Sequence, residues 1–279
     1  TKMKDKKLLS IAKEVIKIEY ISLKKLQSSI GKSFEQIIKT ILNCKSGKVI
    51  ISGVGKSGII GKKWAATFSS TGTPSFFLDA SNASHGDMGQ ITSNDIVILI
   101  SLSGESNELK NIINYTSRNK NIKLIGITSK KDSLLYKNSN VKFLLPTVKE
   151  AGPGSYVPTS STTVQVALGD AIAITCMQYK KFGKIDFKKF HPGGSLSIKL
   201  KTVEDLMLVG KKIPFVNEKL RMTAALKNIE KRKLGTLIVL NNKKLTTGIL
   251  TDGDLKRVSN LSSNLNSLQI KEVMKKNPI

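Results

Sequence analysis

A glycine-rich loop that contains a lysine is the first segment of this sequence able to do chemistry. Residues 53–58 (GVGKSG) fit the pattern G-x-G-x-x-G, which taken alone is a fingerprint of dinucleotide binding. Any ligand held by backbone amides at a helix start needs the same glycines, with Gly55 and Ser57 as candidate contacts. The loop is not a Walker A motif, because Ile50 stands where that motif needs glycine. Lys56 would supply a cation, although a plain turn would also tolerate it as a solvated side chain.

Two further segments place hydroxyl groups where helices are expected to start. Residues 101–108 (SLSGESNE) follow an apolar run, and residues 158–163 (PTSSTT) open a long apolar stretch. Hydroxyls and free amides at a helix start form a phosphate cradle, although the first segment also fits an ordinary N-cap. The second offers more hydroxyls than one cap requires. Together they predict a phosphorylated, polyhydroxylated ligand, with these candidate contacts: Ser101, Ser103, Ser106, Thr159, Ser160 and Ser161.

Four titratable side chains lie close to these segments or in polar loops. Glu108 follows the first serine cluster, and Glu150 follows a predicted strand end, where a salt-bridged surface carboxylate is the alternative. His85 and His191 are the only histidines, and both lie in glycine-containing loops. Their spacing matches no metal-binding motif, so we expect neither a metal nor another cofactor.

The elements that must position these residues follow from the hydrophobic pattern. Residues 8–45 carry apolar positions at helical spacing and predict two helices. Short apolar runs then alternate with helical patterns, which predicts a parallel sheet whose ligand crevice lies at the carboxyl ends of its strands. The expected strands are 48–52, 75–78, 96–100, 124–128 and 141–145, and the expected helices are 59–68, 105–118 and 160–181, followed by a polar loop over 183–195. The fold class is thus α/β, a three-layer sandwich around a five-stranded parallel sheet.

The sequence changes in character beyond residue 200. Residues 203–207, 222–231, 235–240, 244–250 and 251–258 predict a compact βαββα-like unit. Residues 270–274 (IKEVM) then echo residues 203–207 (VEDLM), as the start of a second copy would. We therefore expect four segments: N-terminal helices (1–47) that belong to the first domain, the α/β core of that domain (48–200), a small α+β module (203–262) and the start of a truncated second module (267–279).

Composition constrains the class of protein. The 279 residues carry a formal net charge of +26, and all but four of the 46 basic residues are lysines. Nucleic-acid binding must be considered, but the lysines are spread along the chain without aromatic interleaving or a recognised motif, so we expect none. No apolar run approaches the length of a membrane span, and no signal peptide is apparent, which predicts a cytoplasmic protein without membrane contact. Cys44 and Cys176 lie in apolar segments and are expected to be buried thiols.

The region from Gly53 to Leu200 resembles the sugar-isomerase (SIS) domain, and more closely the bacterial D-arabinose-5-phosphate isomerases. The resemblance implies reversible conversion of D-arabinose 5-phosphate to D-ribulose 5-phosphate, feeding Kdo synthesis for lipopolysaccharide. It also implies a homo-oligomer, expected to be a tetramer, with His191 crossing between subunits. Seven motifs in one order carry the resemblance: residues 53–58, 70–77, 85–89, 103–108, 149–153, 158–163 and 191–194.

The same resemblance assigns site residues. Lys56, Glu108, Glu150 and His191 match catalytic positions of the family, and Gly72, Thr73 and His85 match its sugar-phosphate pocket together with the serines of 101–106. Two positions depart from the family: Leu102 replaces an asparagine, and Asp79 replaces a histidine that is read as a metal ligand in some members. The tail resembles a cystathionine-β-synthase (CBS) module through residues 251–255 (TDGDL), which implies a possible nucleotide ligand.

Aldose–ketose isomerisation through an enediolate defines the chemistry these residues must perform. It needs a base for the C2 proton and a cation for the developing oxyanion. We assign Glu150 as the base, with a pKa raised by burial, and Lys56 as the oxyanion stabiliser. His191 and Glu108 are assigned to ring opening and proton transfer.

Other functions remain open from the sequence alone. A sugar-phosphate-sensing regulator would need the phosphate cradle but not both glutamates and His191. A hexose-phosphate isomerase differs only in pocket length, which the sequence does not show. A dinucleotide oxidoreductase leaves the two hydroxyl clusters unexplained.

Overall fold

The computed structural model describes residues 5–191, 202–261 and 267–278, and it divides into two compact units, Thr1–Leu200 and Lys201–Ile279. In the described part of the chain, no helix is long and apolar enough to cross a membrane. The first unit carries the following elements: α1 (Asp5–Ser29), α2 (Lys32–Asn43), β1 (Val49–Gly53), α3 (Gly55–Ser70), β2 (Ser75–Phe77), α4 (Ala80–Ala83), η1 (Asp87–Gln90), β3 (Ile96–Ile100), α5 (Asn107–Arg118), β4 (Lys123–Thr128), α6 (Leu134–Asn138), β5 (Val141–Leu144), η2 (Pro153–Ser155), α7 (Ser160–Tyr179) and α8 (Lys184–Phe190).

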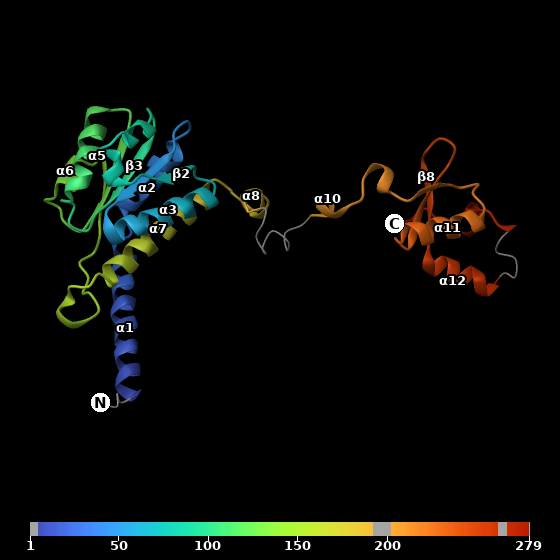
Figure 1. Cartoon of the computed structure of the whole chain (residues 1–279), viewed down its shortest axis with the longest axis horizontal. Helices are drawn as coiled ribbons and strands as arrows, with labels where there is room; N and C mark the ends of the chain where they lie inside the picture. The colour runs from blue at the N-terminus through green and yellow to red at the C-terminus, as the bar shows by residue number, and fades with distance from the viewer. Residues whose placement is uncertain (1–4, 192–201, 262–266, 279) are drawn as a thin grey trace. The chain divides into compact units, whose positions relative to one another are not determined.

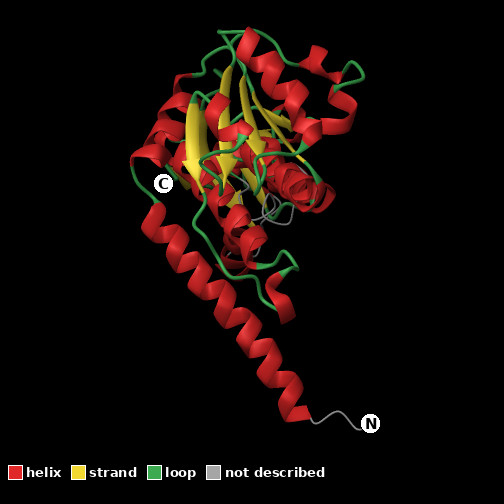
Figure 2. Cartoon of the chain, turned by 90° about the vertical axis from the view of Figure 1, so that its left-hand side faces the viewer, coloured by secondary structure: helices red, strands yellow, loops and turns green. Residues whose placement is uncertain are grey.

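The five strands of the first unit form one parallel sheet in the order β2-β1-β3-β4-β5, which confirms the predicted fold class. The strands β1 and β3 are short and buried along their whole length because both faces of the sheet are covered (Figure 2). Along β3, for example, Ile96, Ile98 and Ile100 face one layer, while Val97 and Leu99 face the other.

Helices cover the sheet in two layers. The layer on one face consists of α2, α3 and α7, and Trp64 of α3, Ile41 of α2 and Leu168 of α7 pack in its core. The layer on the other face consists of α4, α5 and α6, with Ile112 and Leu135 at its centre. The last part of α1 packs on α7, whereas its first turns project from the unit (Figure 1). The result is the predicted three-layer sandwich.

Strand order determines where the loops meet. The chain leaves β1 toward β2 on one side and returns to β3 on the other, so the carboxyl ends of β1 and β3 flank a switch point of the sheet. Gly53 at the end of β1 is in register with Ile100 at the end of β3. The loop 53–58 and the loop 101–106 therefore start side by side.

Two expectations about helices are wrong. The polar loop expected over 183–195 contains the helix α8. At the start of this helix, Gly183 N donates a hydrogen bond to the Asp186 carboxylate (3.1 Å). The strand expected over 203–207 is the short helix α10 (Val203–Leu206), because Thr202 and Asp205 form a capping box at its start. In addition, α3 begins at Gly55, so Lys56 and Ser57 lie in the first turn of a helix.

The second unit is built around a small sheet in the order β6-β7-β8-β9, in which β6 and β7 are parallel and the other pairs antiparallel. The segment 270–274 forms a short helix with its own capping box, as 203–207 does, so the sequence echo has a structural counterpart. Besides α10, the second unit contains the following elements: η3 (Gly210–Lys212), β6 (Phe215–Asn217), α11 (Met222–Arg232), β7 (Thr236–Leu240), β8 (Thr246–Thr251), α12 (Asp252–Leu261), α13 (Ile270–Val273) and β9 (Lys275–Lys276).

Candidate active site

The loop 53–58 opens the site at the carboxyl end of β1. Gly55 has a positive φ of 58°, and no atom lies within 4 Å of the place where its Cβ would be, so the turn leaves open space in front of α3. The first turn of α3 has no side-chain cap, which leaves its backbone amides available to an anion. Lys56 is exposed beside them. A hollow of about 120 Å³ adjoins the loop and extends to Asp79.

The loop 101–106 forms the neighbouring wall. Ser101 is 4% exposed, and its hydroxyl lies 3.1 Å from the hydroxyl of Ser106 and accepts a hydrogen bond from Gly104 N (3.0 Å). Ser106 occupies the N-cap position of α5, but its side chain does not cap the helix. Ser101 and Ser106 therefore do not form the ordinary N-cap that the sequence left open. Ser103 accepts only a local bond from Glu105 N (3.3 Å).

The two glutamates of this loop region have different environments. Glu105 accepts a hydrogen bond from Leu134 N (2.7 Å), which ties the loop to the start of α6 and explains why an acidic residue stands there. Glu108 lies in the first turn of α5 and is exposed. Within residues 5–191 its carboxylate makes no hydrogen bond or ion pair, so it stays available to a ligand.

Glu150 is bound at the start of α7. Its Oε2 accepts hydrogen bonds from Thr159 N (2.7 Å), Thr159 Oγ1 (3.1 Å) and Ser161 N (3.2 Å). Burial favours the neutral acid, but the hydrogen bonds from Ser161 and Thr159 favour the carboxylate more strongly, so the pKa of Glu150 lies below its ordinary value. This direction is the opposite of the raised pKa expected from the sequence. The structure thus holds Glu150 as an anion.

The hydroxyl groups of residues 159–161 have other contacts than those of the loops 53–58 and 101–106. Thr159 and Ser161 bind the Glu150 carboxylate, whereas the Ser160 side chain is fully buried and its Oγ has no partner among the described residues. Ser161 and Gln165 lie one turn apart on one face of α7, and Gln165 Oε1 accepts a hydrogen bond from Ser57 Oγ (3.1 Å). One helix face therefore links Glu150 to the loop that carries Lys56.

His85 lies next to α5. Its loop is tied to that helix by a hydrogen bond from Asn111 Nδ2 to Ser84 Oγ (2.9 Å), and Asn111 lies one turn beyond Glu108. The His85 side chain is exposed. Asp79 caps α4 through bonds from Ser81 N (3.0 Å) and Asn82 N (3.2 Å). Three or more potential metal ligands do not gather anywhere in the described ranges.

His191 is not brought to this edge within one chain. It ends α8, where Nδ1 lies 2.8 Å from Phe187 O and the ring stacks on Phe187 with centroids 3.8 Å apart. Glu150 is held at the start of α7, whereas α8 follows the end of α7, and a helix of 20 residues is about 30 Å long. The rest of its motif, residues 192–194, lies outside the described residues.

Gly72 and Thr73 lie at the opposite edge of the sheet, just before β2. Lys180 Nζ donates hydrogen bonds to Gly72 O (3.1 Å) and Thr73 Oγ1 (2.8 Å), and burial lowers the pKa of Lys180. Gly72 has a φ of 84° and lies so close to Phe182 that a Cβ would overlap the ring. The chain's own Gly72 and Thr73 therefore do not join Lys56 and Glu150.

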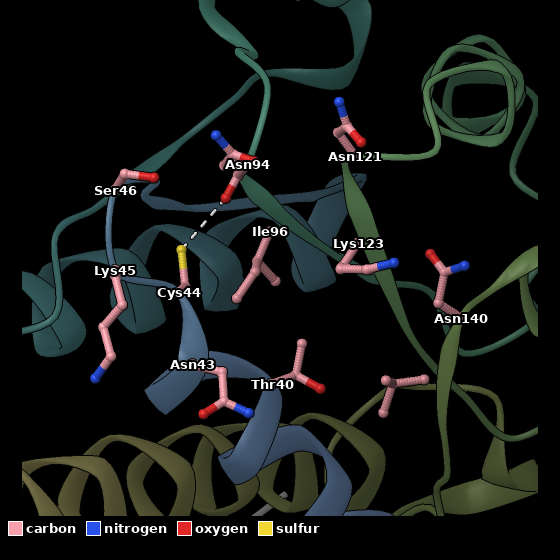
Figure 3. A pocket seen from close by; sticks show the side chains of 11 residues that line it. Thr40, Asn43, Cys44, Lys45, Ser46, Asn94, Ile96, Asn121, Lys123 and Asn140 are labelled. Carbon is pink, nitrogen blue, oxygen red and sulfur yellow. Dashed lines mark hydrogen bonds between the residues drawn. The ribbon is translucent and has the colours of Figure 1, made fainter.

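The amino edge also carries a hollow of about 540 Å³, seen in Figure 3. Carboxamides dominate its wall, and Cys44 Sγ donates a hydrogen bond to Asn94 O (3.4 Å). No carboxylate and none of the predicted site residues line it; the polar wall consists of Thr40, Asn43, Cys44, Lys45, Ser46, Asn94, Asn121, Lys123 and Asn140. Cys44 is a half-buried free thiol, and Cys176 is a buried one.

Gln165 and Asn111 contact candidate-site segments, and sequence reasoning missed both. Asn111 gave no signal, because it lies on the polar side of an amphipathic helix. Gln165 did give one: it is a carboxamide between two valines in an apolar helix, 1% exposed in the structure. A polar side chain at a buried position needs a partner, and that requirement could have pointed to Ser57.

Comparison with known proteins agrees with this arrangement. The SIS domain family model matches residues 41–175. The arabinose 5-phosphate isomerase KdsD of Francisella tularensis subsp. tularensis (strain SCHU S4 / Schu 4) is 44% identical over 270 residues, covering 96% of this chain and 82% of that protein. KdsD of Escherichia coli (strain K12) is 40% identical over 263 residues, covering 94% and 80%.

A solved structure adds a ligand to the comparison. The structure of E. coli CFT073 c3406 in complex with arabinose 5-phosphate superposes with a TM-score of 0.63 and 38% sequence identity, covering 68% of this chain and 100% of that chain. Its coverage matches the first unit in extent, and the family resemblance expected from the seven motifs is confirmed. The chain belongs to the arabinose 5-phosphate isomerase family of SIS-domain proteins.

Proposed function

We propose that this protein interconverts D-arabinose 5-phosphate and D-ribulose 5-phosphate through an enediolate. The observation that carries the proposal is the convergence of Lys56, Glu108 and the anionic Glu150 on the carboxyl edge of the sheet, around two loops whose helices lack side-chain caps. The uncapped amides suit the phosphate, and the charged groups suit proton transfer. Relatives that are 44% and 40% identical to this chain are named arabinose 5-phosphate isomerases.

In the proposed reaction, Glu150 takes the C2 proton of the open-chain aldose. The electron pair of that bond forms the C1–C2 double bond, and the C1 carbonyl oxygen becomes an oxyanion beside Lys56 and the α3 amides. Return of a proton to C1, and transfer of the hydroxyl proton from O2 to O1, gives the ketose. Glu150 is ionised at neutral pH, so it is ready to accept the proton, although its lowered pKa reduces the driving force. Glu108 and His191 are proposed to open the furanose ring.

His191 is proposed to act in the site of a neighbouring subunit. The length of α7 separates it from Glu150 in one chain, and Gly72 and Thr73 likewise lie at the other edge. A homo-oligomer, with a tetramer expected from the family, would supply His191 from a second copy.

The first turns of α1 support an oligomer independently. Leu8 and Ile11 are 43% and 55% exposed, yet they continue the helical stripe on which Ser22 and Leu26 are buried against the unit. These turns project from the unit, and none of its described helices lies beside them (Figure 2). An isolated helical segment is only marginally stable in water, so an apolar stripe at this position suits burial against another copy.

Subunit mixing tests the shared site. Glu150→Gln and His191→Ala variants, each with little activity, should regain a measurable fraction of the activity when they are unfolded together and reassembled. The control is each variant reassembled alone. An active monomer in sedimentation velocity, or a mixture no more active than its parts, would contradict the shared site.

The second unit is proposed to be a CBS module with the start of a second one, and to bind an adenosine nucleotide. A hollow of about 530 Å³ lies beside Thr251, Asp254, Arg257 and Lys275. Thr251 N and Oγ1 donate to Asp254 Oδ2 (2.9 and 2.7 Å), and Arg257 pairs with the same carboxylate. Two cations and a fixed carboxylate suit a phosphate and a ribose. Calorimetric titration with AMP and ATP, with Arg257→Ala as the control variant, tests the assignment.

The pathway and the compartment are also proposals. The names of the relatives support a role in making the arabinose 5-phosphate that Kdo and lipopolysaccharide synthesis consume, in the cytoplasm. A deletion strain that grows only when arabinose 5-phosphate is supplied would support this role. Normal growth without the supplement would contradict it.

The direct test of function follows D-arabinose 5-phosphate by NMR in deuterated buffer with EDTA. Pentose turnover is expected to place deuterium at C1 of D-ribulose 5-phosphate and at C2 of the D-arabinose 5-phosphate that re-forms, as a metal-independent enediolate route requires. Glucose 6-phosphate and fructose 6-phosphate are run alongside, and turnover of these hexoses alone would change the substrate. If no sugar phosphate turns over but one raises the melting temperature, the protein is a sensor.

A further inference from the structure

A partly buried hydrogen bond links the glycine-rich loop to a residue outside the seven motifs. Ser57 Oγ lies 3.1 Å from Gln165 Oε1, and the Gln165 residue is 1% exposed. Ser57 follows Lys56 in the first turn of α3, where a ligand would meet the helix amides. The contact therefore joins the ligand side of the loop to the core of α7.

Both ends of this bond are rigidly placed. Trp64 Nε1 of α3 donates to the main-chain oxygen of Gln165 (3.0 Å), so the two helices are joined at this residue. Gly169, one turn further along α7, lies against the Trp64 ring, where a Cβ would overlap it. Because α3 and α7 are locked at their crossing, Gln165 cannot easily withdraw from Ser57.

The bond decides what Ser57 can offer to a ligand. A hydroxyl has one proton, and when that proton is given to Gln165 Oε1 only the lone pairs of Oγ remain. A phosphate oxygen needs donors, whereas a sugar hydroxyl can donate. We propose that Gln165 is a positioning residue that makes Ser57 an acceptor for a substrate hydroxyl and removes Ser57 from phosphate binding. The phosphate is then left to the backbone amides and to other donors.

The proposal deepens the proposed function and rests on a substrate that has both a phosphate and free hydroxyls. Two single variants test it, Ser57→Ala and Gln165→Leu. Each should raise the KM for D-arabinose 5-phosphate about fivefold to tenfold, the size expected for one lost hydrogen bond. The inhibition constant of inorganic phosphate should stay within about twofold of the parent value in Ser57→Ala, because Ser57 does not donate to phosphate in the parent. In Gln165→Leu it should stay the same or fall, because the Ser57 proton is freed.

Two further variants separate this role from a merely structural one. Gln165→Met keeps the length and the buried apolar surface of the side chain but removes the acceptor, so its KM should rise as in Gln165→Leu. The double variant Ser57→Ala/Gln165→Leu should be no worse than either single variant, because both act through one contact. Gln178→Leu, an exposed glutamine on the same helix, is the matched control and should change nothing. Gln165→Met serves if Gln165→Leu melts too low to assay.

Three results would overturn the proposal. The inhibition constant of phosphate could rise in step with KM, which would make Ser57 a phosphate donor. Gln165→Met could keep the parent KM, which would show that the acceptor is not needed, or the two single effects could add. If no pentose turns over, the proposed function fails separately, and calorimetric Kd values for inorganic phosphate and for D-arabinose 5-phosphate replace Ki and KM in the same comparison.

Discussion

The two edges of the parallel sheet use their polar residues in different ways. At the amino edge, Lys180 binds Gly72 and Thr73, and the buried Asp95 carboxylate lies 2.8 Å from Lys48 Nζ. At the carboxyl edge, Lys56 and Glu108 make no hydrogen bond or ion pair within residues 5–191. Charged groups that the fold leaves unused, beside uncapped helix amides, are the mark of an edge that binds ligands.

Glu150 is an exception to this difference between the two edges. This carboxylate lies at the carboxyl edge but is bound by the start of α7, as a structural residue would be. Its bonds come from the helix that also holds Ser57 through Gln165. Glu150 is therefore both placed and ionised by the scaffold, and it differs from Glu108, which only the ligand would engage.

The largest expected effect is that of Glu150→Gln. The amide keeps the size of the side chain but cannot take the C2 proton, so kcat should fall by about 10² to 10⁴. Loss of deuterium incorporation at C2 from deuterated water checks the assignment directly. Near-normal C2 exchange in this variant would show that another group is the base.

The variant Lys56→Ala, with Lys123→Ala as its matched control, tests the difference between the two edges. We expect kcat to fall by about 10² to 10³ if Lys56 stabilises the oxyanion. Lys123→Ala, an exposed lysine in the amino-edge hollow of Figure 3, is the control and should leave kcat and KM unchanged. A change confined to KM at Lys56 would reduce its role to that of a phosphate ligand.

Two glycines, one at each edge of the sheet, should differ in how much stability an added methyl group costs. Gly72→Ala places a Cβ into the Phe182 ring at a positive φ, and we expect a loss of about 2 to 5 kcal/mol in the free energy of unfolding. Gly55→Ala meets no neighbouring atom, so only the positive φ costs stability, about 1 to 2 kcal/mol. Denaturant unfolding measures both, and an equal loss at the two sites would contradict the difference in packing.

The pH dependence follows from the lowered pKa of Glu150. A carboxylate with a lowered folded pKa adds stability above its unfolded value of 4.5 and loses it as the pH falls through the folded pKa. The melting temperatures of the parent and of Glu150→Gln should therefore differ at pH 7 and converge below pH 4.5. The acidic limb of kcat should also lie below 4.5. An acidic limb near neutrality would mean that bound substrate raises the pKa of Glu150.

Sequence patterns predicted the sheet well, because its strands are short and mostly apolar, as a parallel sheet covered on both faces requires. Residues 96–100, for example, are fully apolar and form β3 as expected. The failures were short helices whose start depends on a cap: Thr202 with Asp205 begins α10 where a strand was expected. Four-residue elements carry too few apolar positions for periodicity to decide.

The site was predictable as far as strand ends determine it. Lys56, Ser101 and Glu108 follow β1 or β3, so they had to lie at the carboxyl edge. The same rule places Gly72 and Thr73 at the amino edge, since they precede β2 (Ser75–Phe77). The order of the motifs along the chain does not by itself say at which end of a strand a residue lies. The pKa of Glu150 was not predictable, because its direction depends on amides nine and eleven residues away in the chain.

The smallest expected effect tests whether the amino edge takes part in catalysis at all. Burial raises the pKa of the Cys176 thiol to about 11, so at pH 8 a thiol reagent should label only the half-buried Cys44, and Cys176 only after unfolding. Cys44 lies in the amino-edge hollow, so its labelling should leave turnover of the pentose phosphate unchanged. Mass spectrometry of the labelled protein, with activity measured on the same sample, makes the comparison. A loss of turnover in proportion to Cys44 labelling would mean that the amino edge takes part in the reaction, through a neighbouring subunit or through the sheet, and the division between the edges would fail.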